Sequence, residues 1–164
     1  MGKKSKILYW VCLMVNIVCF VLDLLPINFP FFRISFAVTL ILIGILLIAR
    51  SVTLKIDSSM FIGILLLLFG ILNGVSYFGQ IWFSLDINQL WPYYLFALAI
   101  SCLVTGLYFK IKTQLKFCLL FLGFGLITLL FVQNLITLVW FVVLMVLYFI
   151  LYFTVNVIIS KRGR

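Results

Sequence analysis

Histidine is absent from this chain of 164 residues, and only three residues are acidic: Asp23, Asp57 and Asp86. With so few of these side chains, the chain offers no paired carboxylates, no nucleophile with its base and no set of metal ligands. Charge is scarce in general, because Asp, Glu, Lys and Arg make up 9% of the residues. We therefore expect a protein that is not an enzyme and that holds no cofactor and no metal ion.

Paired cysteine motifs are also missing. No C-x-x-C pair occurs, and all four cysteines lie inside apolar runs: Cys12, Cys19, Cys102 and Cys118. This placement predicts neither a disulfide framework nor a zinc site. We expect the four thiols to act as small packing groups.

Hydrophobic residues make up 67% of the chain, and they fall into six runs: 7–25, 32–49, 60–78, 92–109, 117–132 and 136–159. About 20 apolar residues are needed to cross a bilayer as a helix. The sequence therefore predicts an all-α integral membrane protein, with residues 1–164 forming one bundle of six transmembrane helices in three hairpins. Gln133 and Asn134 are the only polar residues between the last two runs, so the sequence leaves open whether these are two crossings.

The basic residues indicate the orientation in the membrane. Eleven of the twelve lie at the N-terminus, in the connections after the second and fourth runs, or at the C-terminus, and only Arg33 lies on the other side. Lys and Arg accumulate in cytoplasmic loops. Both termini are therefore predicted to be cytoplasmic, with the helices in the plasma membrane. The net charge of +9 is explained by this topology and does not indicate nucleic-acid binding.

The central hairpin, from Met60 to Phe109, contains small residues at a spacing of four. Gly70 and Gly74 form a G-x-x-x-G, and Cys102 and Gly106 repeat the spacing in the next run. Small residues let helix backbones approach closely in lipid. We expect these two faces to pack on each other within the hairpin, and the alternative is a seam between two copies of the chain.

Aromatic residues flank the connection within the central hairpin. Trp82 precedes the connection, and Trp91 and Pro92 open the following run. Tryptophan is enriched at the membrane interface, and proline is tolerated in the first turn of a helix. The stretch is predicted to anchor at the outer interface or, alternatively, to bind a partner.

Polar residues inside the apolar runs are few. Asp23 ends the first run and Arg33 begins the second on the same side, so we expect an interfacial ion pair between them. Ion or substrate coupling at Asp23 is the alternative. Asn16 and Asn73 lie deeper and are expected to donate hydrogen bonds between helices.

The two segments GILLLLFGILNGVSYFG and LWPYYLFALAISCLVTGLY resemble the transmembrane region of the LiaI/LiaF-like proteins of bacterial envelope-stress systems. The similarity covers residues 61–108. The helix count also resembles that of six-span proteins of the HdeD type. Both resemblances imply a small accessory membrane protein.

We therefore expect a non-enzymatic multi-pass protein that acts through contacts with lipid and with another membrane protein or a second copy of itself. An accessory subunit of a membrane complex and an envelope-stress component both fit this description. The alternative function is a small transporter or a channel component.

Overall fold

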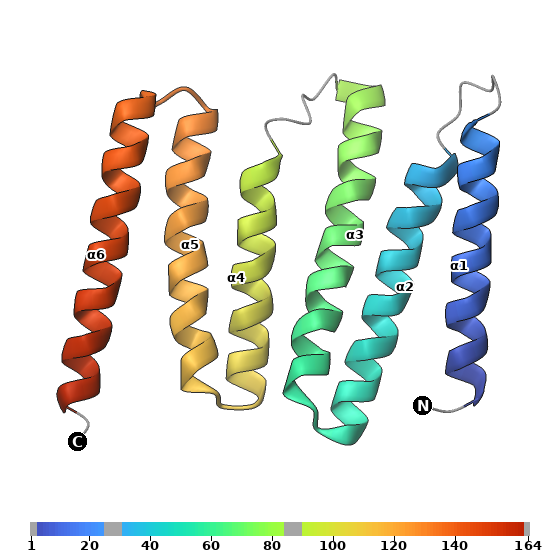
Figure 1. Cartoon of the computed structure of the whole chain (residues 1–164), viewed down its shortest axis with the longest axis horizontal. Coiled ribbons are helices and arrows are strands. Elements are labelled where there is room, and N and C mark those ends of the chain that lie inside the picture. The colour runs from blue at the N-terminus through green and yellow to red at the C-terminus, as the bar shows by residue number, and fades with distance from the viewer. Residues whose placement is uncertain (1–2, 25–30, 84–89, 163–164) are drawn as a thin grey trace. The chain divides into compact units, whose positions relative to one another are not determined.

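The computed structural model describes residues 3–24, 31–83 and 90–162 of the chain, and it is helical (Figure 1). Six helices follow one another: α1 (Lys3–Asp23), α2 (Phe31–Leu54), α3 (Asp57–Phe83), α4 (Trp91–Tyr108), α5 (Lys112–Val132) and α6 (Leu138–Arg162). No strand occurs within the described ranges. The predicted all-α class is confirmed, and the last two runs form separate helices.

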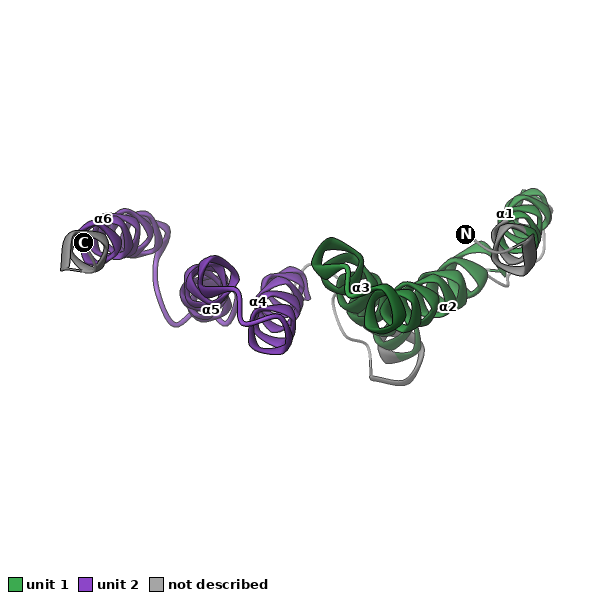
Figure 2. Ribbon diagram, turned by 90° about the horizontal axis from the view of Figure 1, so that it is seen from below, with its two compact units in different colours: residues 1–87 green, residues 88–164 purple. Residues whose placement is uncertain are grey.

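The helices belong to two compact units, residues 1–87 and residues 88–164 (Figure 2). In the first unit α2 lies between α1 and α3, and in the second unit α5 lies between α4 and α6 (Figures 1 and 2). Consecutive helices run in opposite directions within each unit. Each unit is therefore a simple up-and-down arrangement of consecutive helices.

Glycines bring α2 and α3 into backbone contact near their shared turn. A Cβ atom built on Gly44 would lie 2.7 Å from the carbonyl oxygen of Gly63, and one on Gly63 would lie 2.9 Å from the carbonyl oxygen of Gly44. Gly70 continues this face, because its Cβ would lie 2.8 Å from the carbonyl oxygen of Ala37. Close approach of this kind strengthens dispersion contacts where lipid supplies no hydrophobic drive for helix association.

Small and hydroxyl-bearing residues form the contact between α4 and α5. Ser101, Thr105 and Thr128 have no exposed surface. Ser101 donates a hydrogen bond to the carbonyl of Ala97, and Thr128 donates one to the carbonyl of Gly125, whereas Thr105 Oγ1 has no hydrogen-bond partner among the described residues. The contact is therefore held by close packing of small side chains and not by hydrogen bonds between these residues.

Helix α6 meets α5 mainly through aromatic side chains. The Tyr148 hydroxyl donates a hydrogen bond to the carbonyl of Leu119, and its ring packs edge-on to Phe124 at 5.5 Å. Gly123 makes room for this ring, because an added Cβ would overlap Cζ of Tyr148. Farther along, Phe131 and Phe141 lie with ring centroids 4.7 Å apart.

The turns after α2, α4 and α5 share one backbone conformation. Lys55, Lys110 and Asn134 each adopt a left-handed conformation just after a helix, with φ of 53°, 57° and 57°. The next residue in each case donates its N–H to a carbonyl five residues earlier: Ile56 to Ser51, Ile111 to Gly106 and Leu135 to Leu130. This is the Schellman arrangement, which satisfies the last carbonyls of a helix.

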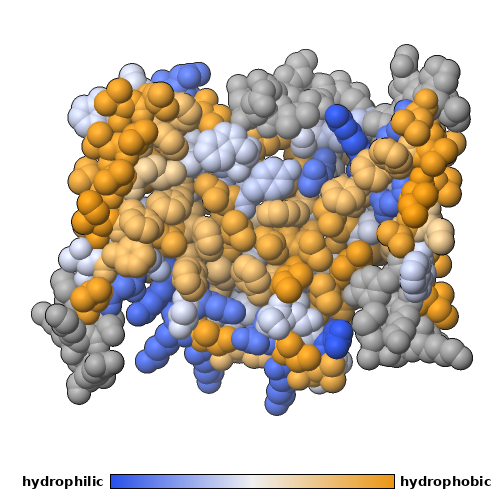
Figure 3. Space-filling view, in the orientation of Figure 1, coloured by the Kyte–Doolittle hydropathy of each residue, from blue (hydrophilic) through white to orange (hydrophobic). Residues whose placement is uncertain are grey.

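Five of the described helices, α2 to α6, are long and apolar enough to cross a membrane, whereas the apolar part of α1, Trp10–Asp23, is shorter. The architecture is therefore that of a multi-pass membrane protein, and a sixth crossing stays a prediction. In each unit, hydrophobic side chains cover the visible middle and hydrophilic ones gather at the end that carries the α2–α3 or the α4–α5 turn (Figure 3).

Candidate functional site

The candidate site lies where α1 and α2 meet, near the connection that joins them. Asp23 ends α1, and its Oδ2 accepts a hydrogen bond of 3.0 Å from the backbone N–H of Phe32 in the first turn of α2. The N-terminal N–H groups of a helix have no partner inside the helix, and a negative charge is favourable there. Asp23 therefore caps α2 from the neighbouring helix.

The predicted ion pair between Asp23 and Arg33 is not formed in the described part of unit 1. Oδ1 of Asp23 is buried and has no hydrogen-bond partner, and Arg33 is exposed. The physical reason is that the carboxylate already accepts the backbone N–H of Phe32, a donor that has no acceptor within its own helix. The carboxylate stabilises the start of α2, and the guanidinium stays available.

A polar network joins α1 and α2 one to two turns deeper. Asn16 Nδ2 donates to Thr39 Oγ1 at 2.6 Å and to the carbonyl of Cys12 at 2.8 Å. Ser35 Oγ donates to Asn16 Oδ1 at 3.1 Å. The prediction that Asn16 makes a hydrogen bond between helices is therefore confirmed.

The other deep asparagine, Asn73, behaves differently. Its Nδ2 donates to the carbonyl of Phe69 in its own helix at 2.8 Å, as Asn156 does to Tyr152 at 2.9 Å. The expected contact of Asn73 with another helix is not among the hydrogen bonds of the described residues. The carbonyl four residues earlier is always within reach in a helix, so this bond competes with any bond to a neighbour.

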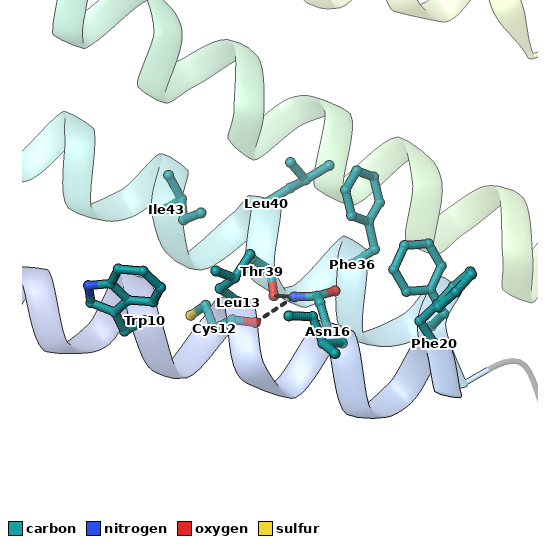
Figure 4. A pocket seen from close by; sticks show the side chains of 11 residues that line it. Trp10, Cys12, Leu13, Asn16, Phe20, Phe36, Thr39, Leu40 and Ile43 are labelled. Atoms are coloured by element: carbon teal, nitrogen blue, oxygen red, sulfur yellow. Dashed lines mark hydrogen bonds between the residues drawn. The ribbon is translucent and has the colours of Figure 1, made fainter. Parts of the chain in front are cut away.

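A groove of about 720 Å³ runs along one side of the α1–α2 contact (Figure 4). Asn16 and Thr39 are the polar members of its lining, and their hydrogen bond to each other leaves little for a ligand to satisfy (Figure 4). The remainder is apolar or aromatic: Trp10, Cys12, Leu13, Ile17, Phe20, Phe32, Phe36, Leu40 and Ile43. Such a groove suits an apolar ligand in volume and in lining.

The small residues chosen from the sequence have neighbours that the spacing did not predict. Gly70 lies against α2, and Gly106 lies against Leu115 of α5, whose Cδ2 would be 3.0 Å from an added Cβ. Cys102 is buried. Gly74 has nothing within 4 Å of an added Cβ, so it marks no close crossing within unit 1, and its expected contact with α4 stays a prediction. The predicted packing of the central hairpin itself would join the two units and stays a prediction.

The start of α4 agrees with the sequence. The helix begins at Trp91 with Pro92 in its first turn, Pro92 is fully buried, and the Trp91 side chain is exposed. Trp82 belongs to the last turn of α3, and its side chain lies outside the described residues, as do residues 84–89. The proposed anchoring of the connection at the interface therefore stays a prediction.

Chemical groups that a reaction needs are not gathered anywhere in the described ranges. No group of three or more His, Cys, Asp or Glu side chains there is placed to hold a metal ion. All four cysteines are free thiols, and three of them, Cys12, Cys102 and Cys118, are buried. What the described residues offer is contact surface, both in the groove and on the outer faces of the helices.

Comparisons with protein-family models, with curated proteins and with solved structures find no match to this chain. The similarity of residues 61–108 to the LiaI/LiaF-like transmembrane region therefore stays a prediction from the sequence. The function has to be argued from the helices themselves.

Proposed function

We propose that this protein is a non-enzymatic accessory subunit of the plasma membrane that acts by packing its outer helix against another membrane protein. The observation that carries the proposal is the exposure of α6. None of residues 138–157 is buried, although α6 is as apolar as the helices that do pack. By contrast, seven residues of α4 are buried: Pro92, Ala97, Ala99, Ser101, Cys102, Thr105 and Gly106.

Lipid can cover an apolar helix without any protein partner, so a partner is indicated by the polar side chains of α6. Asn156 is half-buried and Thr154 is exposed, and both donate only to carbonyls of their own helix. Asparagine and threonine side chains in membrane helices are favourable contacts for a second helix, at roughly 1 kcal/mol each. An exposed apolar helix with such groups fits a partner helix better than lipid alone.

The proposed orientation has both termini in the cytoplasm, and the turns support it. Glycine would fit the left-handed position of each turn best, because it has no Cβ. Lysine occupies this position in the two turns proposed to be cytoplasmic, at Lys55 and Lys110, and asparagine occupies it in the turn proposed to be outside, at Asn134. The two lysines are explained if a positive charge at a cytoplasmic turn stabilises the orientation by more than glycine would stabilise the left-handed backbone.

A role in envelope stress is supported by the resemblance of residues 61–108 alone. The rival function, a transporter or channel component, would use Asp23 and the Asn16 network as a path. Asp23 is occupied in capping α2, and Asn16, Ser35 and Thr39 are bonded to one another. These contacts favour a structural role for the polar residues. A transporter or channel component is therefore the less favoured function.

Photocrosslinking from α6 tests the proposal. A photoreactive residue at Ile150, which is 57% exposed, should capture one defined membrane protein in native membranes. The matched control is Ser101, which has no exposed surface and should give only adducts within the chain. Leu147→Ala and Leu151→Ala should then weaken copurification of the captured protein without lowering thermal stability, because both side chains are mostly exposed in the free chain. Lipid adducts alone at Ile150 would contradict the proposal.

A further inference from the structure

The groove between α1 and α2 is open along its length to whatever surrounds the helices. Several of its lining side chains are about half exposed: Leu13 at 49%, Ile17 at 49% and Phe20 at 52%. With α1 crossing the membrane beside α2, as predicted from the sequence, the medium at this groove is the hydrocarbon of the membrane. The occupant must therefore be apolar where it touches the groove.

The length of the groove limits what fits. On α1 it extends from Trp10 to Phe20, and on α2 from Phe32 to Ile43. At 1.5 Å per residue, these stretches are about 15 Å and about 16 Å long. The hydrocarbon core is about 30 Å thick, so the groove covers about half of it. A partner helix would need a surface along the full thickness, whereas one acyl chain occupies a single leaflet.

The position of the groove shows which half it covers. Phe20 lies one turn before the end of α1, and Phe32 lies in the first turn of α2, so the groove begins at the α1–α2 connection. At the other end of unit 1, α2 leans away from α1 toward α3 (Figure 1). The groove thus reaches from the connection to about the middle of the membrane.

A cation lies in the same turn of α2 as the groove residue Phe32. Arg33 follows the groove residue Phe32, its side chain is exposed, and within the described part of unit 1 it forms no ion pair. The carboxylate that ends α1, Asp23, accepts the N–H of Phe32 through Oδ2, and its Oδ1 has no hydrogen-bond partner among the described residues. A guanidinium is well suited to a phosphate, which it contacts through two parallel hydrogen bonds.

We propose that the α1–α2 groove is a binding site for one phospholipid of the leaflet next to the α1–α2 connection. One acyl chain lies in the groove against Ile17 and Phe36, and the phosphate lies at Arg33. Arg33 is the basic residue that departs from the charge distribution of the other eleven, and this site gives it a function. The site rests on the proposed crossing of α1 but not on a partner of α6, so failure of the α6 crosslinking experiment would leave it standing.

The test uses the full chain in mild detergent, titrated with phosphatidylglycerol and followed by native mass spectrometry. Ile17→Trp fills the groove, and Val18→Trp is its control, because Val18 is 57% exposed and does not line the groove. Arg33→Gln removes the cation, and Arg50→Gln, which removes an exposed arginine at the other end of α2, is its control. Diacylglycerol with the same chains serves as the ligand without a phosphate.

We expect one tightly held lipid per chain, and both Ile17→Trp and Arg33→Gln should weaken its binding about tenfold. The two control variants should bind as the parent chain does, and diacylglycerol should bind as weakly to the parent as phosphatidylglycerol does to Arg33→Gln. Equal affinity of Arg33→Gln and Arg50→Gln for phosphatidylglycerol would overturn the proposed site. Equal affinity of the parent chain for phosphatidylglycerol and diacylglycerol would also overturn it. A dimer mass that disappears in Ile17→Trp would show that a second copy of the chain occupies the groove instead.

Discussion

Gly44 of α2 and Gly63 of α3 lie so close that a Cβ atom on either would come within 2.9 Å of the other's carbonyl oxygen. Real Cβ atoms do not approach backbone atoms so closely, and neither backbone can yield without moving its helix. The pair therefore fixes where the two helices touch. It lies toward the α2–α3 turn, while Asn16 and Asp23 hold α1 against the opposite end of α2.

Gly44→Ala should destabilise unit 1 by about 1–3 kcal/mol, because the added methyl group has to push two backbones apart. Gly74→Ala is the matched control, since an added Cβ there meets nothing within 4 Å. Alanine is also the better helix former by about 1 kcal/mol, so the control should be neutral or stabilising. Thermal melting in detergent measures both. Equal melting temperatures for the two variants would contradict the assigned crossing.

The hydrogen bond between Asn16 and Thr39 should contribute about 1 kcal/mol to the association of α1 with α2. Asn16→Leu and Thr39→Val should each lower stability, and the double variant should cost less than the sum of the two, since both remove the same bond. Asn73→Leu is the control, because Asn73 donates to its own helix. A double-mutant cycle with no coupling would show that the bond is not formed.

Lys110→Gly should raise stability by about 1 kcal/mol, because a residue with a Cβ is strained at the φ of 57° found here and glycine is not. Lys112→Gly removes the same charge at the first residue of α5, where the backbone is helical, and should not stabilise. Unfolding measurements on the two variants separate the backbone effect from the charge effect. A gain of the same size in both would assign the change to charge.

Gly123→Ala should loosen α6 from α5, because the new methyl group would overlap the ring of Tyr148. A loss of about 1–3 kcal/mol is expected. Tyr148→Ala removes the ring, so adding Gly123→Ala to that variant should cost little more. Strictly additive losses would mean that Gly123 and Tyr148 do not meet.

Sequence patterns were enough to predict the helices, because long apolar runs and the Trp91–Pro92 start depend on local chemistry. They were also enough to find Asn16. They were not enough to choose between glycines: Gly70 and Gly74 share one motif, yet Gly70 touches α2 and Gly74 has open space. A four-residue spacing gives the face of a helix but not the neighbour that this face meets.

The most informative residues that sequence reasoning missed are Gly44, Thr39 and Gly123. Gly44 lies eleven residues before the turn residue Lys55 and Gly63 lies eight residues after it, so folding the hairpin back at the turn brings them to similar depths. That comparison was available from the sequence. The groove was not, because it depends on how α2 leans away from α1.

The capping role of Asp23 shows why its predicted partner was wrong. Opposite charges near each other in the sequence favour a salt bridge, but an unpaired backbone N–H at the start of a helix is an equally good donor and needs no side-chain ordering. The choice between them depends on where the end of α1 lies relative to the first turn of α2, which the sequence does not give.

The central claim, six crossings with both termini in the cytoplasm, is tested most directly by thiol accessibility in intact cells. The four native cysteines are replaced by alanine, and single cysteines are placed at Ser5, Thr113 and Asn134. We expect an impermeant maleimide to label Asn134→Cys from outside, and to label Ser5→Cys and Thr113→Cys only after the membrane is opened. Labelling of Ser5→Cys in intact cells would show that α1 does not cross, and labelling of Thr113→Cys with protection of Asn134→Cys would reverse the orientation.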